Sequence, residues 1–300
     1  MLPLVSIITP TYRRFDYIER VIKSVLGQDY GRIEYIITDD GSENCPIDLI
    51  NSIVKKNQKG NIEAFRLIVN SNNIGTVKNL NNAVRQSSGE YIMFLAGDDI
   101  FYNSHVVSEV VQEFLDRRCN TLAVTRYCVD SNDMFLGYLP HLADRKIIQN
   151  WDRKEQHERF IKAIYKNMAS GSALYFKRDF FVEIGGFSER YILWEDGPFI
   201  YKCTKNERIE VAYEIVGIRY RMDGVSSNPN EMLLKDGKLF NKLEIEVEKK
   251  NSNWMLRGFI NFRTEKDYCP AILLALRYPL VSIVFLYEFI RDKILWLLKK

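Results

Sequence analysis

The chain has 300 residues, of which 46% are hydrophobic and 27% charged, with a formal net charge of +3. This composition is typical of a globular protein that can bury a sizeable core. Lysine and arginine are not gathered in blocks, which argues against a nucleic-acid-binding surface. We therefore expect one or two folded domains and no nucleic-acid partner.

The cysteines and the first residues both indicate the cytoplasm. The five cysteines are scattered along the chain without C-x-x-C spacing, so a zinc ribbon or a redox motif is not expected. An odd, scattered set is typical of reduced thiols. The start, MLPLVSIITPTYRR, lacks the basic region and the long apolar run of a signal peptide.

The first 130 residues alternate short β-type runs with stretches of helical periodicity. The expected strands are Leu4–Thr9, Ile33–Thr38, Ala64–Val69, Tyr91–Leu95 and Thr121–Val129. The expected helices are Tyr17–Leu26, Ile47–Lys55, Val77–Arg85 and His105–Leu115. Such alternation predicts crossover units and a mostly parallel sheet flanked by helices, which is an α/β fold.

The second half is less regular. Residues 130–160 are polar and predict a flexible loop, and Ser172–Phe176 predicts another strand. From Glu231 a charged helical stretch begins an appendage. We therefore expect a catalytic domain over residues 1–228 and a helical C-terminal extension over residues 229–300.

Three polar clusters follow expected strands: Thr9–Arg13, Asp39–Ser42 and Gly97–Asp99. Alone, Asp39–Ser42 is more often a turn with a helix cap, Gly97–Asp99 is as readily a loop that caps the next helix, and Thr9–Arg13 indicates little. Together they suggest one crevice, because ligands of open α/β sheets gather beyond the carboxyl ends of the strands. Neither GxGxxG nor a P-loop motif is present. Carboxylates repel phosphates, so paired aspartates indicate a Mg²⁺ or Mn²⁺ ion that bridges to a nucleotide-diphosphate substrate.

Six stretches occur in a characteristic order: VSIITPTYRR, YIERVIKSVLGQDY, YIITDDGSEN, NIGTVKNLNNAVRQSSGEYIMFLAGDD, SGSALYFKRDFFVEIGGF and LWEDGPFIYKC. From about Leu4 to Ser226 the chain thereby resembles the family 2 glycosyltransferases of the GT-A fold. The resemblance implies a GT-A-like domain and a metal-dependent, inverting transfer. The donor would be a nucleotide-diphosphate sugar, in particular a UDP-sugar, and the acceptor a glycan hydroxyl.

The resemblance also implies roles for single residues. Contacts with the nucleotide sugar are expected from Thr9, Thr11, Tyr12, Asp40, Lys78 and Asp98. Asp98 and Asp99 correspond to the metal-binding region, in which Ala96 replaces the first acidic residue, and we favour Asp99 as the direct ligand. Asp223 stands where relatives often have a metal-binding histidine, although a turn before Gly224 explains it as well.

Glu195 and Asp196 form a second acidic pair. Taken alone, the pair is typical of a helix N-terminus, where carboxylates are favoured by the helix dipole. By resemblance, Asp196 is the general base, and Glu195 takes that role if the pair is displaced by one residue. A sugar hydroxyl attacks poorly until a group accepts its proton. A base on the face opposite the leaving group inverts the anomeric centre, as in inverting glycosidases.

The segment Ala271–Leu298 is strongly apolar, but charged residues interrupt it and leave no run long enough to span a bilayer. We expect a helix in the membrane interface. The alternative is a helical hairpin that packs on the catalytic domain or on a second subunit of a homo-oligomer. An interfacial helix would hold the enzyme on the cytoplasmic face of the inner membrane. Its acceptor there would be a polyprenyl-diphosphate-linked sugar, as in O-antigen or capsule synthesis.

Two rival functions remain at this stage. A sugar nucleotidyltransferase would need a glycine-rich phosphate loop with a basic residue after the first strand, where this chain has TPTYRR. A catalytically inactive relative that serves as an assembly or sugar-binding subunit is suggested by Ala96. The presence of Asp98, Asp99 and Asp196 argues against that second alternative.

Overall fold

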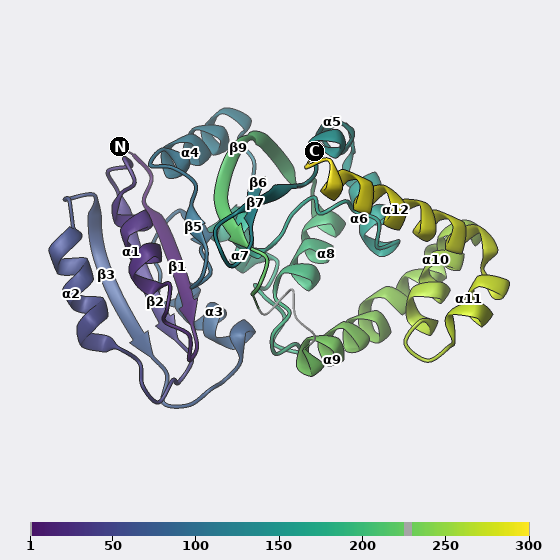
Figure 1. The fold of residues 1–300 in the computed structure, drawn as a ribbon, viewed down its shortest axis with the longest axis horizontal. Coiled ribbons are helices and arrows are strands. Elements are labelled where there is room, and N and C mark those ends of the chain that lie inside the picture. The colour runs from purple at the N-terminus through teal and green to yellow at the C-terminus, as the bar shows by residue number, and fades with distance from the viewer. Residues whose placement is uncertain (1, 225–229, 300) are drawn as a thin grey trace.

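A mixed β-sheet forms the centre of the computed structural model, which describes residues 2–224 and 230–299. Within these residues the strand order is β3-β2-β1-β4-β8-β6-β9-β5, and β7 pairs with β6 (Figure 1). The expected domain boundary at residue 228 lies outside the described residues.

The N-terminal half has the expected alternation of parallel strands and helices. Its strands are β1 (Val5–Thr11), β2 (Ile33–Asp39), β3 (Ile62–Val69) and β4 (Tyr91–Phe94). Its helices are α1 (Ile18–Leu26), α2 (Ile47–Asn57) and α3 (Thr76–Arg85). Both faces of β2 are buried, because α1 and α2 contribute to one apolar cluster and α3 to the other.

Beyond β4 the strand directions change. The elements here are β5 (Ile100–Phe101), α4 (Val106–Arg117), β6 (Thr121–Val129), a short 3₁₀ turn (Gly171–Ala173), β8 (Leu174–Lys177), α7 (Arg178–Glu183), α8 (Asp196–Asn206) and β9 (Glu210–Arg221). β8 runs antiparallel to both β4 and β6. The turn before β8 therefore lies at the carboxyl end of β4, where the Ser172 hydroxyl accepts the N–H of Ala96 at 3.2 Å.

The prediction of a flexible loop over residues 130–160 is wrong. This segment forms β7 (Phe135–Leu139), α5 (Leu142–Gln149) and α6 (Arg153–Ile161). Some of its apolar residues, such as Ile148 and Phe160, are buried in the core, whereas others, such as Met134 and Leu142, are exposed. The polar surface positions between them concealed the helical pattern, because α6 exposes far more polar than apolar side chains.

The C-terminal extension is helical, as expected. It comprises α9 (Glu231–Phe240), a π turn (Asn241–Ile245), a 3₁₀ helix (Glu246–Asn251), α10 (Trp254–Glu265), α11 (Ala271–Arg277) and α12 (Pro279–Leu297). The chain runs away from the sheet through α9 and α10, and α12 returns toward β7 and α5 (Figure 1). Phe240, Ile245 and Ile260 belong to the same apolar cluster as residues of α8, so the extension shares its core with the sheet domain.

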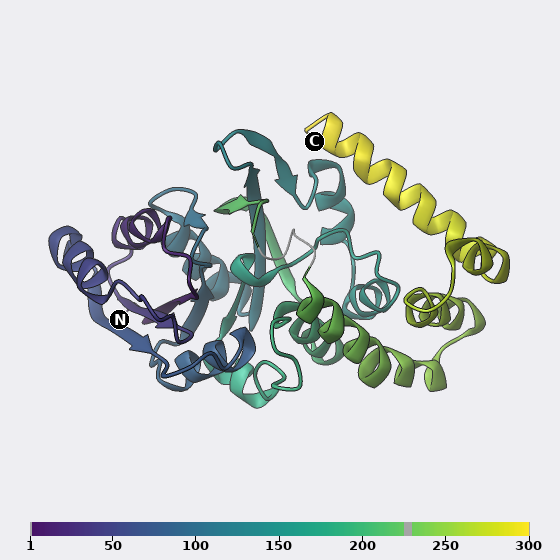
Figure 2. The same cartoon turned by 60° about the horizontal axis from the view of Figure 1, so that its bottom comes forward.

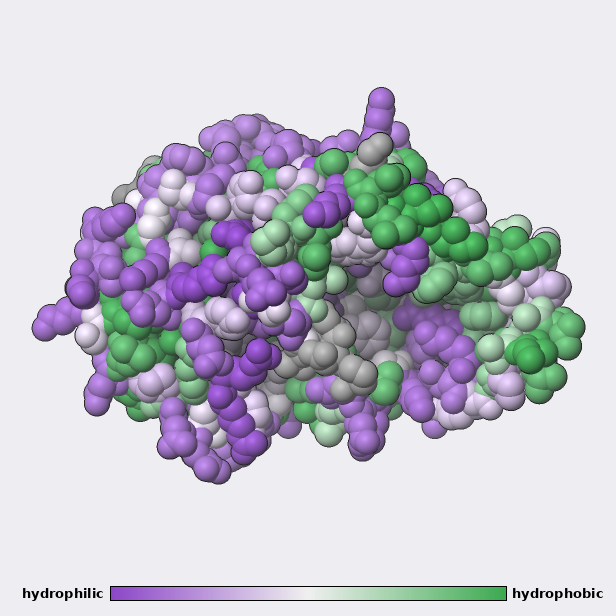
Figure 3. Space-filling view, viewed as in Figure 1, coloured by the Kyte–Doolittle hydropathy of each residue, from purple (hydrophilic) through white to green (hydrophobic). Residues whose placement is uncertain are grey.

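Helix α12 contacts the rest of the molecule through charged side chains. Arg291 Nη1 donates to Asp144 Oδ2 at 3.0 Å, and Lys166 Nζ donates to Glu288 Oε2 at 2.7 Å. A second set of side chains is apolar and exposed: Leu280, Ile283, Leu286, Phe289, Ile290, Ile294 and Leu297. Figure 3 shows this hydrophobic surface along α12, and Figure 2 shows the helix at the edge of the molecule. None of the described helices is long and apolar enough to cross a membrane.

Candidate active site

The three polar clusters predicted at strand ends do meet at one edge of the sheet. Thr11 lies beside Asp39 in the parallel register of β1 and β2, and its hydroxyl donates to Asp39 Oδ2 at 3.0 Å. Gly97 lies against β1 so closely that an added Cβ would be 3.0 Å from the carbonyl oxygen of Pro10. The three polar clusters are therefore in direct contact at this edge, where the sequence predicts a crevice.

Asp39 shapes the loop that follows β1. Its carboxylate accepts the backbone N–H of Ser42 at 2.7 Å and the Ser42 hydroxyl at 2.8 Å. The same hydroxyl accepts the N–H of Arg13 at 2.7 Å. These bonds leave Tyr12 on the surface, 37% exposed, with the Arg13 guanidinium 4.9 Å from its ring centroid.

Asp40 holds the start of α3. Its Oδ1 accepts the N–H of Ile74 and its Oδ2 that of Gly75, both at 2.9 Å. Gly75 has φ +91°, a conformation that favours glycine. Lys78, in the first turn of α3, is exposed. Asp40 is thus buried and engaged by backbone donors, so its effect on this side of the crevice runs through the position of α3.

Thr9 was expected to contact the nucleotide sugar, but it lies inside the sheet. Its side chain is fully buried, and its hydroxyl lies 3.3 Å from that of Tyr35 inside the sheet. Thr11 is also buried and bonded to Asp39. Of the residues expected to contact the nucleotide sugar, the structure therefore brings Tyr12 and Lys78 to the surface, and places Thr9, Thr11 and Asp40 beneath it.

Asp99 is a buried carboxylate at the carboxyl end of β4. Its Oδ1 accepts the N–H of Arg221 at 3.1 Å, while its Oδ2 is buried without a hydrogen-bond partner among the described residues. Burial, and then the negative charge of Asp98, raise the pKa of Asp99 to about 8. Burial also raises the pKa of Asp98, although the positive charge of Arg14 opposes this shift.

The acidic residues of this edge fit a cation only in part. In the described parts of the chain, no group of three or more His, Cys, Asp or Glu residues is arranged to hold a metal ion. Asp223 pairs with Arg221, whose Nε lies 3.3 Å from Asp223 Oδ1. Asp99 does fit, because a divalent cation would satisfy its bare Oδ2 and offset the repulsion from Asp98. The ligand roles of Asp98 and Asp223 remain predictions.

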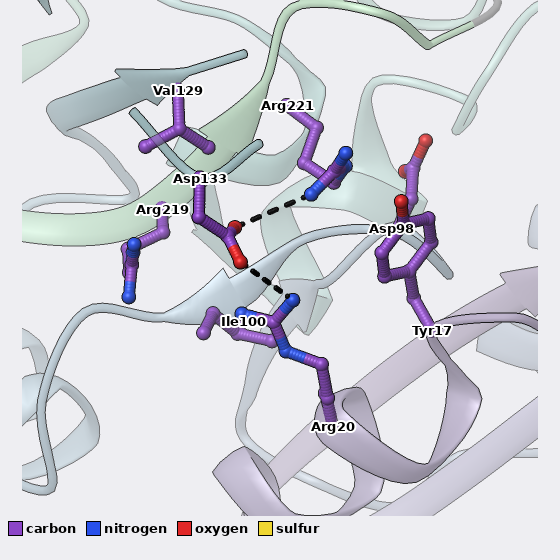
Figure 4. A pocket seen from close by; sticks show the side chains of 8 residues that line it. All are labelled: Tyr17, Arg20, Asp98, Ile100, Val129, Asp133, Arg219 and Arg221. Carbon is purple, nitrogen blue, oxygen red and sulfur yellow. Dashed lines mark hydrogen bonds and ion pairs between the residues drawn. The ribbon is translucent and has the colours of Figure 1, made fainter. Parts of the chain in front are cut away.

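A small pocket adjoins Asp98 on the side of α1 (Figure 4). Asp133, from the loop between β6 and β7, accepts from Arg20 at 3.0 Å and from Arg221 at 3.3 Å. The Arg221 guanidinium lies 4.1 Å from the ring centroid of Tyr17. These contacts fasten the loop onto α1, so they form one wall beside Asp98.

The second acidic pair lies at the start of α8, with Glu195 at the N-cap and Asp196 in the first turn. Asp196 Oδ2 accepts the N–H of Gly171 at 3.1 Å. A Cβ added to Gly171 would lie 2.9 Å from Glu195 Oε1, so a side chain at position 171 would displace the Glu195 carboxylate. Burial, and then the negative charge of Asp196, raise the pKa of Glu195 to about 8.

The two acidic pairs are joined through the short turn before β8. Ser172 bonds to Ala96, just before Asp98 and Asp99, and Gly171 bonds to Asp196. The sequence showed both pairs but not this connection, since it depends on β8 running antiparallel to β4. Asp236 was missed entirely. It is one acidic residue in a charged helical stretch, yet its carboxylate accepts three backbone N–H groups just before Glu195.

The same fold occurs in solved glycosyltransferases. *S. aureus* TarS 1–349 in complex with UDP-GlcNAc superimposes with a TM-score of 0.60 at 18% identity, over 88% of this chain and 73% of that one. A mannosyltransferase from *Pyrobaculum calidifontis*, in complex with GDP-Man and Mn²⁺, gives 0.57 at 16% identity, over 100% of this chain and 87% of that one. The fold is therefore that of the GT-A glycosyltransferases. The model of glycosyl transferase family 2 matches residues 6–185, and the chain belongs to this family.

Curated relatives match shorter stretches. TuaG of *Bacillus subtilis*, whose name assigns it to teichuronic acid biosynthesis, is 32% identical over 131 residues, which are 44% of this chain and 49% of TuaG. A GalNAc(5)-diNAcBac-PP-undecaprenol beta-1,3-glucosyltransferase of *Campylobacter jejuni* is 36% identical over 99 residues, which are 33% of this chain and 30% of that one. The chain thus spans at most about half the length of these two relatives.

Proposed function

We propose that the protein is an inverting glycosyltransferase of bacterial surface-polysaccharide synthesis, of the O-antigen or capsule type. It moves a sugar from a nucleotide-diphosphate sugar, in particular a UDP-sugar, to a hydroxyl of a polyprenyl-diphosphate-linked glycan. The observation that carries this proposal is the connection of two acidic pairs, Asp98–Asp99 and Glu195–Asp196, through Ser172 and Gly171. Sugar transfer needs charge stabilisation at the leaving diphosphate and a base at the acceptor.

The donor side of the crevice is formed by β1, β2 and the start of α3. Tyr12 and Lys78 are exposed there and are available for the nucleotide base and the diphosphate. Thr9, Thr11 and Asp40 support this surface from beneath. A UDP-sugar donor is supported by the structural likeness to TarS, whose complex contains UDP-GlcNAc.

Mg²⁺ or Mn²⁺ would be held by Asp99, with Asp98 beside it and Asp223 as a third acidic neighbour. Asp99 contributes a buried oxygen without a partner and a proton affinity that a cation would lower. Bound there, the ion supplies positive charge that stabilises the departing diphosphate. The Mn²⁺ complex of the *P. calidifontis* mannosyltransferase supports a metal in this fold.

Asp196 accepts the proton of the acceptor hydroxyl. Burial, and then the negative charge of Asp196, raise the pKa of Glu195, so Glu195 keeps its proton to higher pH than an ordinary carboxyl group. The Gly171 N–H fixes one oxygen of Asp196. The hydroxyl then attacks C1 from the face opposite the diphosphate, the C1–O bond to the diphosphate breaks, and the anomeric centre inverts.

The exposed apolar residues of α11 and α12 would rest in the headgroup region of the cytoplasmic face of the inner membrane. These residues lie beside basic side chains such as Arg277, Lys293 and Lys299, which suit an anionic lipid surface. The *C. jejuni* relative, whose name contains an undecaprenol-linked substrate, supports a lipid-linked acceptor.

The test is a transfer assay with a panel of nucleotide sugars and a short polyprenyl-diphosphate-linked monosaccharide, read by mass spectrometry. We expect one donor to give a product one sugar heavier, with NMR showing an anomeric configuration opposite to that of the donor. The Asp196→Asn variant is the control for catalysis by this site. Absence of transfer from every donor contradicts the proposed activity, and a retained configuration contradicts the mechanism.

A further inference from the structure

A single carboxylate from the C-terminal extension clamps the loop that leads into the second acidic pair. Asp236 Oδ2 accepts the N–H groups of three consecutive residues, Ile192 at 2.9 Å, Leu193 at 2.7 Å and Trp194 at 3.0 Å. The Asp236 side chain lies in α9 and is 3% exposed. Three backbone donors on one ionised oxygen form a charge-assisted cluster, which is stronger than three neutral bonds.

The same loop is also held from the donor side. The carbonyl oxygen of Ile192 accepts the N–H of Val77 at 3.1 Å. Ile192 packs against Gly75 so closely that an added Cβ would lie 2.8 Å from Ile192 Cγ2. Because Asp40 bonds to Gly75, the loop connects the donor side of the crevice with the start of α8.

Trp194 completes the attachment. Its indole lies on Gly197, where an added Cβ would come within 2.2 Å of the ring. Phe240, one turn after Asp236 in α9, meets the same indole edge-on, with 5.2 Å between ring centroids. Helix α9 therefore supplies both a polar and an aromatic contact to the residues directly before Glu195.

We propose that Asp236 is a positioning residue for the Glu195–Asp196 pair. By fixing the backbone of Ile192–Trp194, it sets where α8 begins and where both carboxylates lie relative to Gly171. The acceptor side of the active site is then built in part by the C-terminal extension, beyond the residues that the family model matches. The catalytic role of the pair rests on the proposed function, whereas the clamp itself does not.

The charge of Asp236 has a second effect. Besides burial, the charged groups that raise the pKa of Glu195 are Asp196 in α8 and Asp236 in α9, and both are acidic. Removing the negative charge of Asp236 should therefore lower the pKa of Glu195.

The first measurement is amide hydrogen exchange across residues 191–197 in the full-length protein. Asp236→Ala should expose the amides of Ile192, Leu193 and Trp194, and Asp236→Asn should keep part of their protection because its side-chain oxygen still accepts. Glu231→Gln is the matched control, since Glu231 is an exposed carboxylate in the first turn of the same helix. Unchanged exchange in Asp236→Ala overturns the proposal, whatever the activity.

The second measurement is the pH dependence of kcat with a fixed donor and acceptor. Asp236→Ala should lower kcat ~10²-fold through misplacement of the pair, with the donor KM little changed. Asp236→Asn should recover most of the rate and move the inflection near pH 8 to lower pH. A wild-type rate and pH profile in both variants overturns the positioning role.

The two levels of the proposal fail differently. If the wild type transfers no sugar, or Asp196→Asn retains activity, the proposed function fails and the exchange experiment still decides the clamp. If Asp236→Ala does not fold, Asp236→Asn decides through amide exchange, because loss of the charge should weaken all three bonds to Ile192, Leu193 and Trp194. Wild-type protection of these three amides in Asp236→Asn then contradicts the proposal.

Discussion

The carboxylate of Asp40, at the end of β2, accepts the backbone N–H of Gly75, at the start of α3, at 2.9 Å. Through this bond the end of a strand fixes the start of a helix, and Ile192 packs against the same glycine. The edge that we propose as the donor side and the loop before α8 therefore meet at Gly75.

Replacing Asp40 by alanine should weaken donor binding and also destabilise the fold. The N–H of Ile74 would lose its acceptor and that of Gly75 would keep only the side-chain oxygen of Asn73; an unpaired buried N–H costs about 1–3 kcal/mol. Calorimetry with UDP and thermal unfolding measure the two effects. Asp40→Asn, which keeps one acceptor oxygen, should lie between the wild type and Asp40→Ala. Unchanged UDP affinity in Asp40→Ala would refute a role for this contact in the donor site.

Asp99 should be required for metal binding. Asp99→Asn removes the charge that would attract a divalent cation, so Mn²⁺ binding in the presence of UDP should fall at least ~10-fold, as measured by calorimetry. Transfer should stop in excess chelator and return when Mn²⁺ or Mg²⁺ is added. Asp133 is a nearby acidic residue that is bonded to Arg20 and Arg221. The Asp133→Asn variant is the control and should bind Mn²⁺ like the wild type. Full activity in chelator would exclude the metal.

Asp196→Asn should abolish transfer but leave UDP binding and the melting temperature nearly unchanged. Asparagine accepts the N–H of Gly171 as aspartate does, but it cannot take a proton from the acceptor. Loss of a general base typically costs ~10²–10⁴-fold in rate. Glu195→Gln is the companion variant. An active Asp196→Asn beside an inactive Glu195→Gln would move the base to Glu195, and activity in both would end the proposed mechanism.

Glu195 should make the protein less stable as the pH rises. Its pKa is about 8 in the folded state against an ordinary value of 4.5, so the unfolded chain releases this proton at lower pH than the folded one. The free energy of unfolding therefore falls between pH 4.5 and 8. Glu195→Gln lacks this loss and should exceed the wild type by on the order of 1 kcal/mol at pH 8.5, yet match it at pH 4.5. Urea unfolding at both pH values tests this, and parallel profiles would contradict it.

The apolar side of α12 should bind lipid. Replacing Ile283, Leu286 and Phe289 by serine removes three exposed apolar side chains, and vesicles with anionic lipid should then bind the protein ~10²-fold more weakly. Serine at the exposed Leu49, Leu115 and Val182, in other helices, is the matched control. The opposite outcome is a wild-type protein that is a dimer and does not bind vesicles, together with an α12 variant that is a monomer. That outcome would identify the apolar surface of α12 as a subunit interface.

Much of the fold could be predicted because its signals are local. β2 and α3 carry their periodicity within about ten residues each, and their ends were predicted to within two residues. α6 could not be recognised, because few of its side chains are apolar and its stability comes from packing against α8. A polar helix of this kind is stabilised by tertiary contacts, which a local sequence pattern does not reveal.

The residues of the candidate site also differ in whether local sequence could reveal them. Asp99 could be found because it closely follows the expected strand Tyr91–Leu95, whereas Asp196 was singled out by the resemblance to a known family. Asp236 could not be found, since its role depends on α9 folding back onto a loop forty residues earlier in the chain. Thr9 shows the opposite limit: the expected strand ended at Thr9, but β1 continues to Thr11, and the buried Thr9 side chain lies beside Tyr35 inside the sheet.

The segment that binds α12 also contacts the Glu195–Asp196 pair. Lys166 bonds to Glu288, and a few residues later Gly171 bonds to Asp196. Between them the chain makes a tight turn, with Lys166 and Asn167 at positive φ. If α12 rests on a bilayer, the height of Asp196 above the lipid is therefore fixed by a short, braced stretch of backbone. An acceptor tethered to that bilayer would have to bring its hydroxyl to this height, so transfer would depend on the length of the glycan already attached.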